Sequence, residues 1–324
     1  MTVTERFKNN MLQTILSAIL FVGTGIVLLA PQVPLIRKVS EYSVHIMLGM
    51  LLFSMFSMVV GKTKVMFAGL ACTAALCIFL KNASHSTLKL TEANTETKLN
   101  VAHINLGNIN TTEFDAVEKM LEDEHIDVVS FQELNLDWKL IEDKLKVRFP
   151  YSVSEVRIDP YGMAIYSRTP FIDSDMFMCE DIPNIYVEVE KADSRFQIIS
   201  SYLIPALDNQ GLRKASKQLD AIAEKVVNNG NVPLIALGEY NMVYWTNEIR
   251  NFRSKTRLQN SRRDLVDSNL RVPYDHIFFS NSLECIEFAE MKDESQNYIG
   301  IMGTYQIKGE KDYHTLNSQL SLNY

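Results

Sequence analysis

The chain has 324 residues and a formal net charge of −7 at pH 7, with 39 acidic and 32 basic residues. Residues 1–81 hold seven basic and two acidic residues, so residues 82–324 carry a charge of −12. Non-specific nucleic-acid binding depends on clustered Lys and Arg, so this balance weighs against a nucleic-acid partner and favours a small or lipid-embedded substrate. The four cysteines form no CxxC pair and no metal-type spacing, and nothing favours a Cys179–Cys285 disulfide.

Three apolar segments near the N-terminus predict membrane-spanning helices. Met11–Ala30 has 20 residues without a charged side chain, about the number that crosses a bilayer core of ~30 Å. Tyr42–Gly61 is the second segment, and Val65–Leu80 is the third, whose 16 residues reach only about 24 Å, so its flanking lysines must extend to the interface. A cleaved signal peptide is the alternative for the first segment, but two apolar segments behind it favour an anchor.

We therefore expect a three-helix transmembrane anchor over residues 1–81, a polar linker over residues 82–98 and a soluble domain over residues 99–324. The linker is polar and has no hydrophobic periodicity. The positive-inside rule does not orient the anchor, because the flanking loops on each side would carry four basic residues.

The soluble domain has more predicted strands than helices. The expected helices contain Phe114–Leu121, Trp138–Leu145 and Leu212–Val227. Because several strands follow one another directly, the alternation of a doubly wound sheet fails, and we expect a layered α/β or α+β domain. The expected strands are Leu99–Leu106, Ile126–Glu133, Tyr151–Ile158, Gly162–Ser167, Tyr186–Glu190, Phe196–Leu203, Pro233–Gly238, Asp275–Ser280, Leu283–Met291 and Thr315–Leu322.

Polar side chains recur where these strands begin or end. Glu133 ends the apolar strand IDVVSFQE, where a carboxylate is costly unless it has a partner or a chemical role. Active-site residues tend to gather at the ends of buried strands, so these positions are the candidates for chemistry. The residues in such positions are Asn105, Asn108, Glu133, Glu239, Asn241, Asp275, His276 and His314.

Seven motifs in order carry a family resemblance from Leu99 to the C-terminus: HINLGN, DVVSFQE, YGMAIYSR, SSYLIP, LGEYN, YDHIFFS and DYHTLNSQLSL. The chain resembles the endonuclease/exonuclease/phosphatase superfamily, which includes exonuclease III-like nucleases, neutral sphingomyelinases and inositol-polyphosphate phosphatases. The resemblance implies a four-layer α/β sandwich. Within the superfamily the chain is most similar to bacterial members with three N-terminal membrane helices, which implies a multi-pass inner or plasma membrane protein with an extracytoplasmic catalytic domain.

The resemblance also implies a metal site and a water-activating group. Asn105 and Glu133 match the residues that hold a divalent cation, and oxygen ligands of this kind suit Mg²⁺ or Mn²⁺. Glu239 and Asn241 match the family motif GDFN, whose Asp activates the attacking water.

Three further residues match positions that surround the phosphate in the family. His314 matches the histidine that contacts the scissile phosphate, and Asp275 matches the carboxylate that braces it. Tyr202 is acceptable as a hydroxyl that contacts the phosphate. A metal and an imidazolium would then neutralise the charge that develops on the phosphoryl oxygens, while a carboxylate takes the proton from water.

Two departures from the family pattern leave a second function open. Glu239 stands where the family has Asp, and one extra methylene can misplace a water by about 1 Å, at a cost of about 10²-fold in rate. Tyr313 stands where an Asp is expected near the metal. The sequence therefore predicts either a phosphoesterase acting on a phosphodiester or phosphomonoester such as a lipid headgroup, or a catalytically inactive domain that is a membrane-tethered binding or scaffold subunit. The expected partners are the lipid bilayer, a phospholipid or another small phosphoester, and proteins that contact the membrane helices.

One dense basic cluster lies within the acidic domain. Its centre is Arg262-Arg263, and Arg250, Arg253, Lys255 and Arg257 lie close by in sequence. We expect a solvated helix and loop; the alternative is a docking surface for anionic lipid headgroups.

Overall fold

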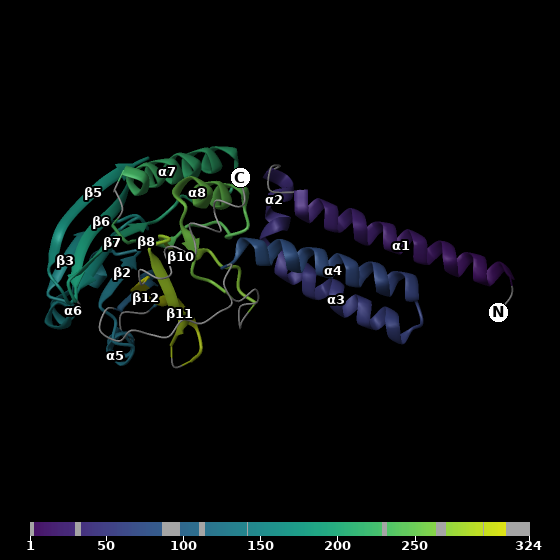
Figure 1. The fold of residues 1–324 in the computed structure, drawn as a ribbon, viewed down its shortest axis with the longest axis horizontal. Helices are drawn as coiled ribbons and strands as arrows, with labels where there is room; N and C mark the ends of the chain where they lie inside the picture. The colour runs from purple at the N-terminus through teal and green to yellow at the C-terminus, as the bar shows by residue number, and fades with distance from the viewer. Residues whose placement is uncertain are drawn as a thin grey trace. The chain divides into compact units, whose positions relative to one another are not determined.

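The computed structural model describes residues 3–29, 34–85, 98–109, 114–140, 142–228, 232–263, 270–293 and 295–308. These residues form two compact units (Figure 1). The helical unit contains the described residues up to 85 together with 242–250 and 270–273, and the sheet unit contains the rest. The predicted boundaries at residues 81 and 98 stay a prediction.

The helical unit contains α1 (Val3–Leu29), α2 (Pro34–Glu41), α3 (Ser43–Val59) and α4 (Thr63–Ala83). Of these helices, α1 over Asn9–Leu29 and α4 are long and apolar enough to cross a membrane. The expectation of three spans is corrected, because α3 has 17 residues, or about 25 Å of helix, and falls short of that length. Conversely, the short third segment lies within a helix of 21 residues.

Small residues allow α3 and α4 to pack closely. A Cβ atom placed on Gly69 of α4 would lie 2.1 Å from the Ser54 hydroxyl oxygen of α3, so a larger residue there would displace the Ser54 side chain. Close approach through small residues is typical of helices that associate in a membrane. Large apolar side chains elsewhere on these helices are exposed, for example Val59 and Phe67 at 84% and 66%.

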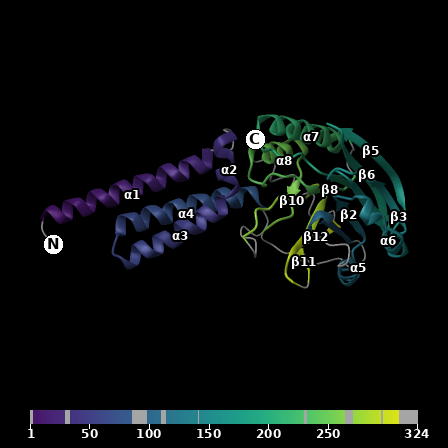
Figure 2. The ribbon, with the colours of Figure 1, turned by 180° about the vertical axis from the view of Figure 1, so that it is seen from behind.

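The sheet unit is built on two six-stranded sheets (Figures 1 and 2). The strands of the first sheet, in spatial order, are β11 (Leu283–Lys292), β12 (Tyr298–Ile307), β1 (Leu99–Asn105), β2 (Val128–Gln132), β4 (Met163–Ser167) and β3 (Tyr151–Glu155). Those of the second are β5 (Phe171–Cys179), β6 (Ile182–Lys191), β7 (Ser194–Ser201), β8 (Leu234–Glu239), β10 (Asp275–Phe279) and β9 (Gln259–Asn260). The pairs β1 with β2 and β7 with β8 are parallel.

Helices cover the outer faces of the sheets and complete the sandwich. The helix α5 (Phe114–Asp123) packs Phe114, Val117 and Leu121 against the first sheet, near α6 (Glu142–Arg148). The helix α7 (Asn209–Asn228) lies along the second sheet (Figure 1). The helix α8 (Asn247–Thr256) begins among residues of the helical unit and ends in the sheet unit. The layered α/β sandwich expected from the sequence is confirmed.

The alternation of side chains along the strands separates two cores, one between the sheets and one between the first sheet and the helices that cover it. On β1, Leu99 and Val101 face the second sheet, while Ala102 and Ile104 face the helices. Residues two apart in a strand share a face, so every second residue of the inner strands enters the layer between the sheets.

Sequence reasoning missed several elements, including β5, β12 and α8, and misjudged others. Strand β5 was missed because its charged centre Asp173-Ser174-Asp175 looks like a loop, and β12 because two glycines interrupt its apolar residues. Helix α8 was missed because it is polar throughout most of its length. The expected helix at Trp138–Leu145 is a 3-10 helix, Leu136–Leu140, followed by α6. The expected strand Thr315–Leu322 lies outside the described residues.

The centre of the basic cluster is not solvated as the sequence predicts, whereas Arg250, Lys255 and Arg257 are exposed. Arg262 is 4% exposed, its Nη1 lies 3.1 Å from Glu290 Oε1, and its guanidinium stacks over the Phe288 ring at 5.1 Å. Arg263 donates from its side chain to the Cys285 carbonyl oxygen. The two arginines at the centre of the cluster therefore join this loop to β11 and do not form a lipid-docking surface.

We expect Arg262→Ala to lower the free energy of unfolding by about 3–5 kcal/mol, because it removes the buried guanidinium that pairs with Glu290 and stacks over Phe288. Lys255→Ala is the matched control, since Lys255 and Asp220 form a pair of the same kind whose side chains are 52% and 72% exposed. Exposed pairs of this kind contribute little to stability. The free energies of unfolding of the two variants are measured by denaturant unfolding. Equal losses in both would contradict the structural role given to the Arg262–Glu290 pair.

Candidate functional site

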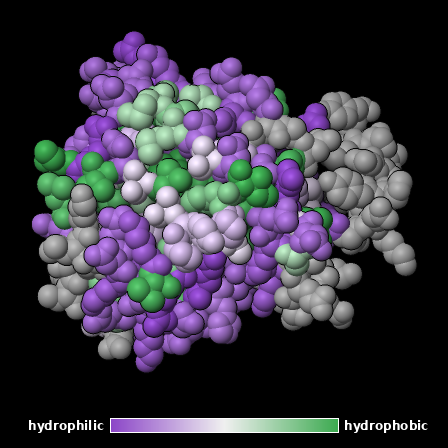
Figure 3. Space-filling view, turned by 90° about the vertical axis from the view of Figure 1, so that its left-hand side faces the viewer, coloured by the Kyte–Doolittle hydropathy of each residue, from purple (hydrophilic) through white to green (hydrophobic). Residues whose placement is uncertain are grey.

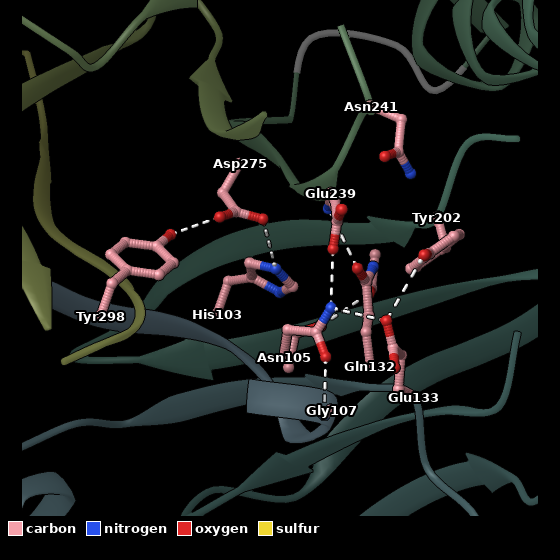
Figure 4. A network of polar contacts seen from close by, with 12 residues as sticks. His103, Asn105, Gly107, Gln132, Glu133, Tyr202, Glu239, Asn241, Asp275 and Tyr298 are labelled. Carbon is pink, nitrogen blue, oxygen red and sulfur yellow. Dashed lines mark hydrogen bonds and ion pairs between the residues drawn. The ribbon is translucent and has the colours of Figure 1, made fainter. Parts of the chain in front are cut away.

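The layer between the two sheets changes from apolar to polar toward one end. On β1 the inward-facing series runs from Leu99 and Val101 to His103 and Asn105. On β8 it ends at Glu239, whose cross-strand partner on the antiparallel β10 is Asp275. The C-terminal ends of β1, β2 and β8 and the N-terminal end of β10 therefore bring polar side chains together (Figure 4).

Asn105 lies at the centre of this polar cluster. Its Nδ2 donates to Glu133 Oε1 at 3.0 Å and to Glu239 Oε2 at 2.7 Å, and its Oδ1 accepts from the Gly107 amide at 2.7 Å (Figure 4). The chain brings Glu239 to Asn105 from 134 residues away and from the other sheet. Asn105 is 5% exposed, whereas both carboxylates are partly open to solvent. Two carboxylates thus converge on one amide group at the rim of the cluster.

Gln132 connects the sheets directly below the carboxylates. Its Nε2 donates to the Ser201 carbonyl at 2.8 Å and its Oε1 accepts from the Glu239 amide at 3.0 Å, although the side chain is fully buried. Gly238 makes this possible, because a Cβ there would lie 2.1 Å from Ser201 O and 2.6 Å from Gln132 Nε2. Sequence reasoning missed Gln132, although its position beside Glu133 on an otherwise apolar strand was a usable signal.

The backbone is held in an unusual conformation at two of the candidate residues. Glu133 has a φ of 60° and Asn241 a φ of 50°, in the left-handed region that non-glycine residues seldom occupy. Such strain is of order 1–3 kcal/mol per residue and persists only where the surroundings enforce it, most often at functional sites. A Cβ at Gly107 would lie 2.1 Å from Glu133 Oε2, so the glycine leaves room for the carboxylate.

Tyr202 lies on the far side of Glu133 and remains protonated. Its hydroxyl donates to Glu133 Oε1 at 3.5 Å. Burial, followed by the nearby Glu239 and Glu133 carboxylates, raises the pKa of Tyr202 well above its usual value, and a hydrogen bond with Asn241 opposes this shift in part. The phenol is therefore a hydrogen-bond donor over the physiological pH range. Gln218 of α7 fixes its backbone, with Nε2 donating to the Tyr202 carbonyl at 3.1 Å.

Asp275 forms a second part of the cluster with two residues that sequence reasoning did not single out. Its Oδ1 lies 3.4 Å from His103 Nε2, and its Oδ2 accepts from the Tyr298 hydroxyl. His103 and Asp275 are 0% and 3% exposed. Neither partner had a sequence signal, because a single His within a strand and a Tyr at the start of a strand are usually structural.

Comparison with known families identifies the chain. The sequence profile described as the Endonuclease/Exonuclease/phosphatase family matches residues 100–295. The chain belongs to this family. No curated protein sequence matches it.

Solved structures agree with the family on the fold. An endonuclease/exonuclease/phosphatase from Beutenbergia cavernae has a TM-score of 0.55 at 12% identity, covering 66% of this chain and 72% of that one. A second endonuclease/exonuclease/phosphatase, from Bacteroides vulgatus, has a TM-score of 0.54 at 13% identity. The match covers 65% of this chain and 100% of that one. D. rerio TDP2 complexed with a single-strand DNA product has a TM-score of 0.52 at 18% identity. The match covers 64% of this chain and 99% of that one.

Members of this family typically use Mg²⁺, and the cluster contains oxygen ligands of the kind that such an ion prefers. Among the residues that the structure describes, no group of three or more His, Cys, Asp and Glu could hold a metal. The cluster instead offers two partly exposed carboxylates and an amide, and the Asn105 amide group lies between the carboxylates, where their charges attract a cation. Mg²⁺ commonly binds through one or two carboxylates and keeps several waters, so this oxygen-rich set suits it.

The structure brings together most of the residues predicted as a site. Asn105, Glu133, Tyr202 and Glu239 form one connected network. Asp275 is the cross-strand partner of Glu239. Asn241 lies next to them and donates from Nδ2 to the Leu203 carbonyl at 2.9 Å (Figure 4). Of the other candidates, Asn108 ends the 3-10 helix Leu106–Asn108, and His276 is buried against the Tyr240 and Phe278 rings. His314 and its neighbour Tyr313 lie outside the described residues.

Proposed function

We propose that this protein is a membrane-anchored, divalent-cation-dependent phosphoesterase, and that the network around Asn105 is its active site. The observation that carries the proposal is the convergence of Glu133 and Glu239, from different sheets, on the same Asn105 amide group. Two carboxylates held this close at a solvent-accessible rim are unfavourable without a cation. The strained backbone at Glu133 supports a functional reason for the arrangement.

In this proposal Asn105 and Glu133 hold the cation, which is Mg²⁺ or Mn²⁺. When bound, the ion supplies Lewis-acid stabilisation of charge on a phosphoryl oxygen. The amide of Asn105 would turn so that its oxygen, and not its nitrogen, faces the ion. Asn and Gln amides present either atom after a rotation of the terminal group, and here the rotation gives up the hydrogen bond that Oδ1 accepts from the Gly107 amide.

The other polar residues act on water and on the phosphate. Glu239 accepts the proton of the attacking water, as a general base does. Tyr202, being protonated, donates a hydrogen bond to a phosphoryl oxygen, and Asn241 orients the same group. The family resemblance assigns the contact with the scissile phosphate to His314, which lies outside the described residues, and the carboxylate that braces it to Asp275.

A phosphate ester at a membrane is the proposed substrate. The exposed apolar faces of α1 and α4 support insertion into a bilayer. The face of the sheet unit in Figure 3 is largely hydrophilic, as expected of a domain outside the bilayer. The charge of −12 over residues 82–324 disfavours a polynucleotide. We place the sheet unit on the extracytoplasmic side, on the resemblance to anchored bacterial members.

The rival function is a non-catalytic, membrane-tethered binding or scaffold subunit. Glu239 in place of the family Asp favours it, and so does the internally satisfied network, in which Asn105 already bonds both carboxylates. Partners of such a subunit would contact the membrane helices.

Hydrolysis by the purified full chain in detergent separates the two functions. The substrates are bis(p-nitrophenyl) phosphate, p-nitrophenyl phosphate, and vesicles containing sphingomyelin or a phosphoinositide. We expect turnover of at least one of them with Mg²⁺ or Mn²⁺, and its loss on chelation. Absence of turnover on all of them, with no cation binding, would support the scaffold function.

A further inference from the structure

Two contacts join the sheets side by side at the polar end of the layer between them. Asn105 contacts Glu239, and two residues earlier on β1 His103 contacts Asp275. Residues two apart on a strand share a face, so His103 and Asn105 both face the second sheet. Opposite them, Glu239 of β8 and Asp275 of β10 are direct partners in the antiparallel register. The two contacts are therefore neighbours on both sheets.

The His103 contact is more deeply buried than the Asn105 contact. His103 and Asp275 are 0% and 3% exposed, whereas Glu239 is partly open to solvent. A carboxylate buried this deeply is stable only where other groups pair with it or donate hydrogen bonds to it. His103 Nε2 lies 3.4 Å from Asp275 Oδ1, and the Tyr298 hydroxyl donates to Oδ2. Both oxygens of Asp275 are thus contacted from the first sheet, by β1 and β12.

Strand β12 packs closely on β1 beside His103. Gly300 of β12 is the register partner of Ile104, and a Cβ on Gly300 would lie 2.1 Å from the His103 carbonyl oxygen. Glycine in a strand interior often marks a close approach of another backbone, and a side chain here would push the two strands apart. Tyr298 lies only two residues before this glycine. The close packing therefore brings His103 and Tyr298 to the same carboxylate.

Asp275 and Glu239 are carboxylates at directly opposite positions of neighbouring strands. Side chains in such positions have Cβ atoms about 4.5–5.5 Å apart, and like charges there are destabilising. The groups that contact Asp275 offset this repulsion and hold its carboxylate in place. In Figure 4 the Tyr298 hydroxyl lies on the side of Asp275 that is away from Glu239. Glu239 in turn accepts from Asn105 Nδ2 at 2.7 Å, so its position depends on where Asp275 is held.

We propose that His103 and Tyr298 are positioning residues: by holding Asp275 they fix Glu239 at its distance from Asn105. The effect on turnover rests on the proposed function, in which Glu239 is the general base, but the effect on the end of β8 does not. A displacement of about 1 Å in a catalytic group can lower the rate by about 10²-fold, so a small movement of Asp275 reduces turnover in a protein that remains folded.

The test compares Tyr298→Phe with Tyr186→Phe in the full chain. Each variant removes one hydroxyl that donates to a buried carboxylate, because Tyr186 donates to Glu188 Oε2 at 3.1 Å. Glu188 keeps a second hydrogen bond in its variant, as Asp275 keeps its contact with His103. Both variants are expected to lower the melting temperature. Only Tyr298→Phe is expected to lower kcat for bis(p-nitrophenyl) phosphate, by about tenfold, with KM changed less than about twofold, because it displaces the base and not the cation ligands.

Hydrogen exchange at residues 237–240 is the second readout, and it needs no activity. The Glu239 amide donates to Gln132 Oε1 at 3.0 Å, so its exchange rate reports how firmly the end of β8 is held against the first sheet. We expect Tyr298→Phe and His103→Gln to speed exchange there by about threefold or more, while Tyr186→Phe leaves it unchanged.

Unchanged exchange in both the Tyr298 and His103 variants would overturn the proposal even if the protein hydrolyses phosphate esters. An equal rise in Tyr186→Phe would also overturn it, because the effect would then be a general loss of stability, and so would an unchanged kcat of Tyr298→Phe in an active protein. Faster exchange in the Tyr298 and His103 variants alone, in a protein without any turnover, would retain the link between Asp275 and Glu239 and reject only the proposed function.

Discussion

Glu133→Gln is expected to lower kcat/KM for bis(p-nitrophenyl) phosphate by about 10³-fold, because it removes a carboxylate whose cation contributes several kcal/mol of transition-state stabilisation. The substitution preserves the shape of the side chain. It removes the charge that Asn105 and Tyr202 both contact at Oε1. The measurement is steady-state hydrolysis at saturating Mg²⁺ or Mn²⁺.

The matched control is Glu224→Gln on the exposed surface of α7, which should leave the rate unchanged. Because burial already keeps the Tyr202 phenol protonated, its hydroxyl remains available in both proteins. If Glu133→Gln retains activity within about threefold of the native protein, the cluster is not where the cation acts, since a lost ligand is worth more than that.

Shortening the second carboxylate is expected to lower turnover as well. Glu239→Asp should reduce kcat by about 10²-fold, because it withdraws the carboxylate by about 1 Å or more from the position that the site uses. In this structure Glu239 Oε2 reaches Asn105 Nδ2 at 2.7 Å, so the network is matched to the longer side chain. The measurement is kcat and KM for the same diester.

Because the family has Asp at this position, this experiment shows whether the site is adapted to Glu239 or whether Glu239 is a substitution that has impaired it. Glu239→Gln keeps the length and removes the charge, and a general base typically contributes 10²–10⁴-fold, so it should be at least as damaging as the shorter acid. A rise in turnover on restoring Asp would mean that Glu239 is a degenerate substitution and that the scaffold function is the better description.

The sequence was informative about the site where a charged residue interrupted an apolar pattern. Glu133 stood out because a buried strand rarely ends in a carboxylate without a reason, and it does lie in the cluster with Asn105 and Glu239. That these residues meet required the packing of one sheet on the other. The family resemblance supplied this information, and local patterns did not.

Residues inside the sheets were harder to predict. Gln132, His103 and Tyr298 are polar side chains on strands whose neighbours are apolar, and only the register of the sheets reveals what they contact. Strand alternation places such residues on a face but does not name their partners. Gln132 carries two cross-sheet bonds that no single-strand pattern encodes.

Two predictions were wrong: the clustering of basic residues predicted a solvated Arg262, and the length of an apolar segment predicted a third membrane span. Arg262 looked solvated beside other basic residues, yet it pairs with Glu290 on a strand 28 residues away. The apolar pattern of Tyr42–Gly61 looked long enough to span a bilayer, but α3 ends at Val59 and begins at Ser43, after α2 has turned the chain. Helix ends depend on tertiary contacts that composition does not contain.

Titration calorimetry of the full chain with Mn²⁺ tests the central claim most directly, with the Glu133→Gln variant beside it. The proposed site predicts about one cation per chain for the native protein, bound through Asn105 and Glu133, and at least tenfold weaker binding for the variant, in line with the loss of a ligand that anchors the ion. Binding of equal affinity in both proteins, or none in either, would contradict it.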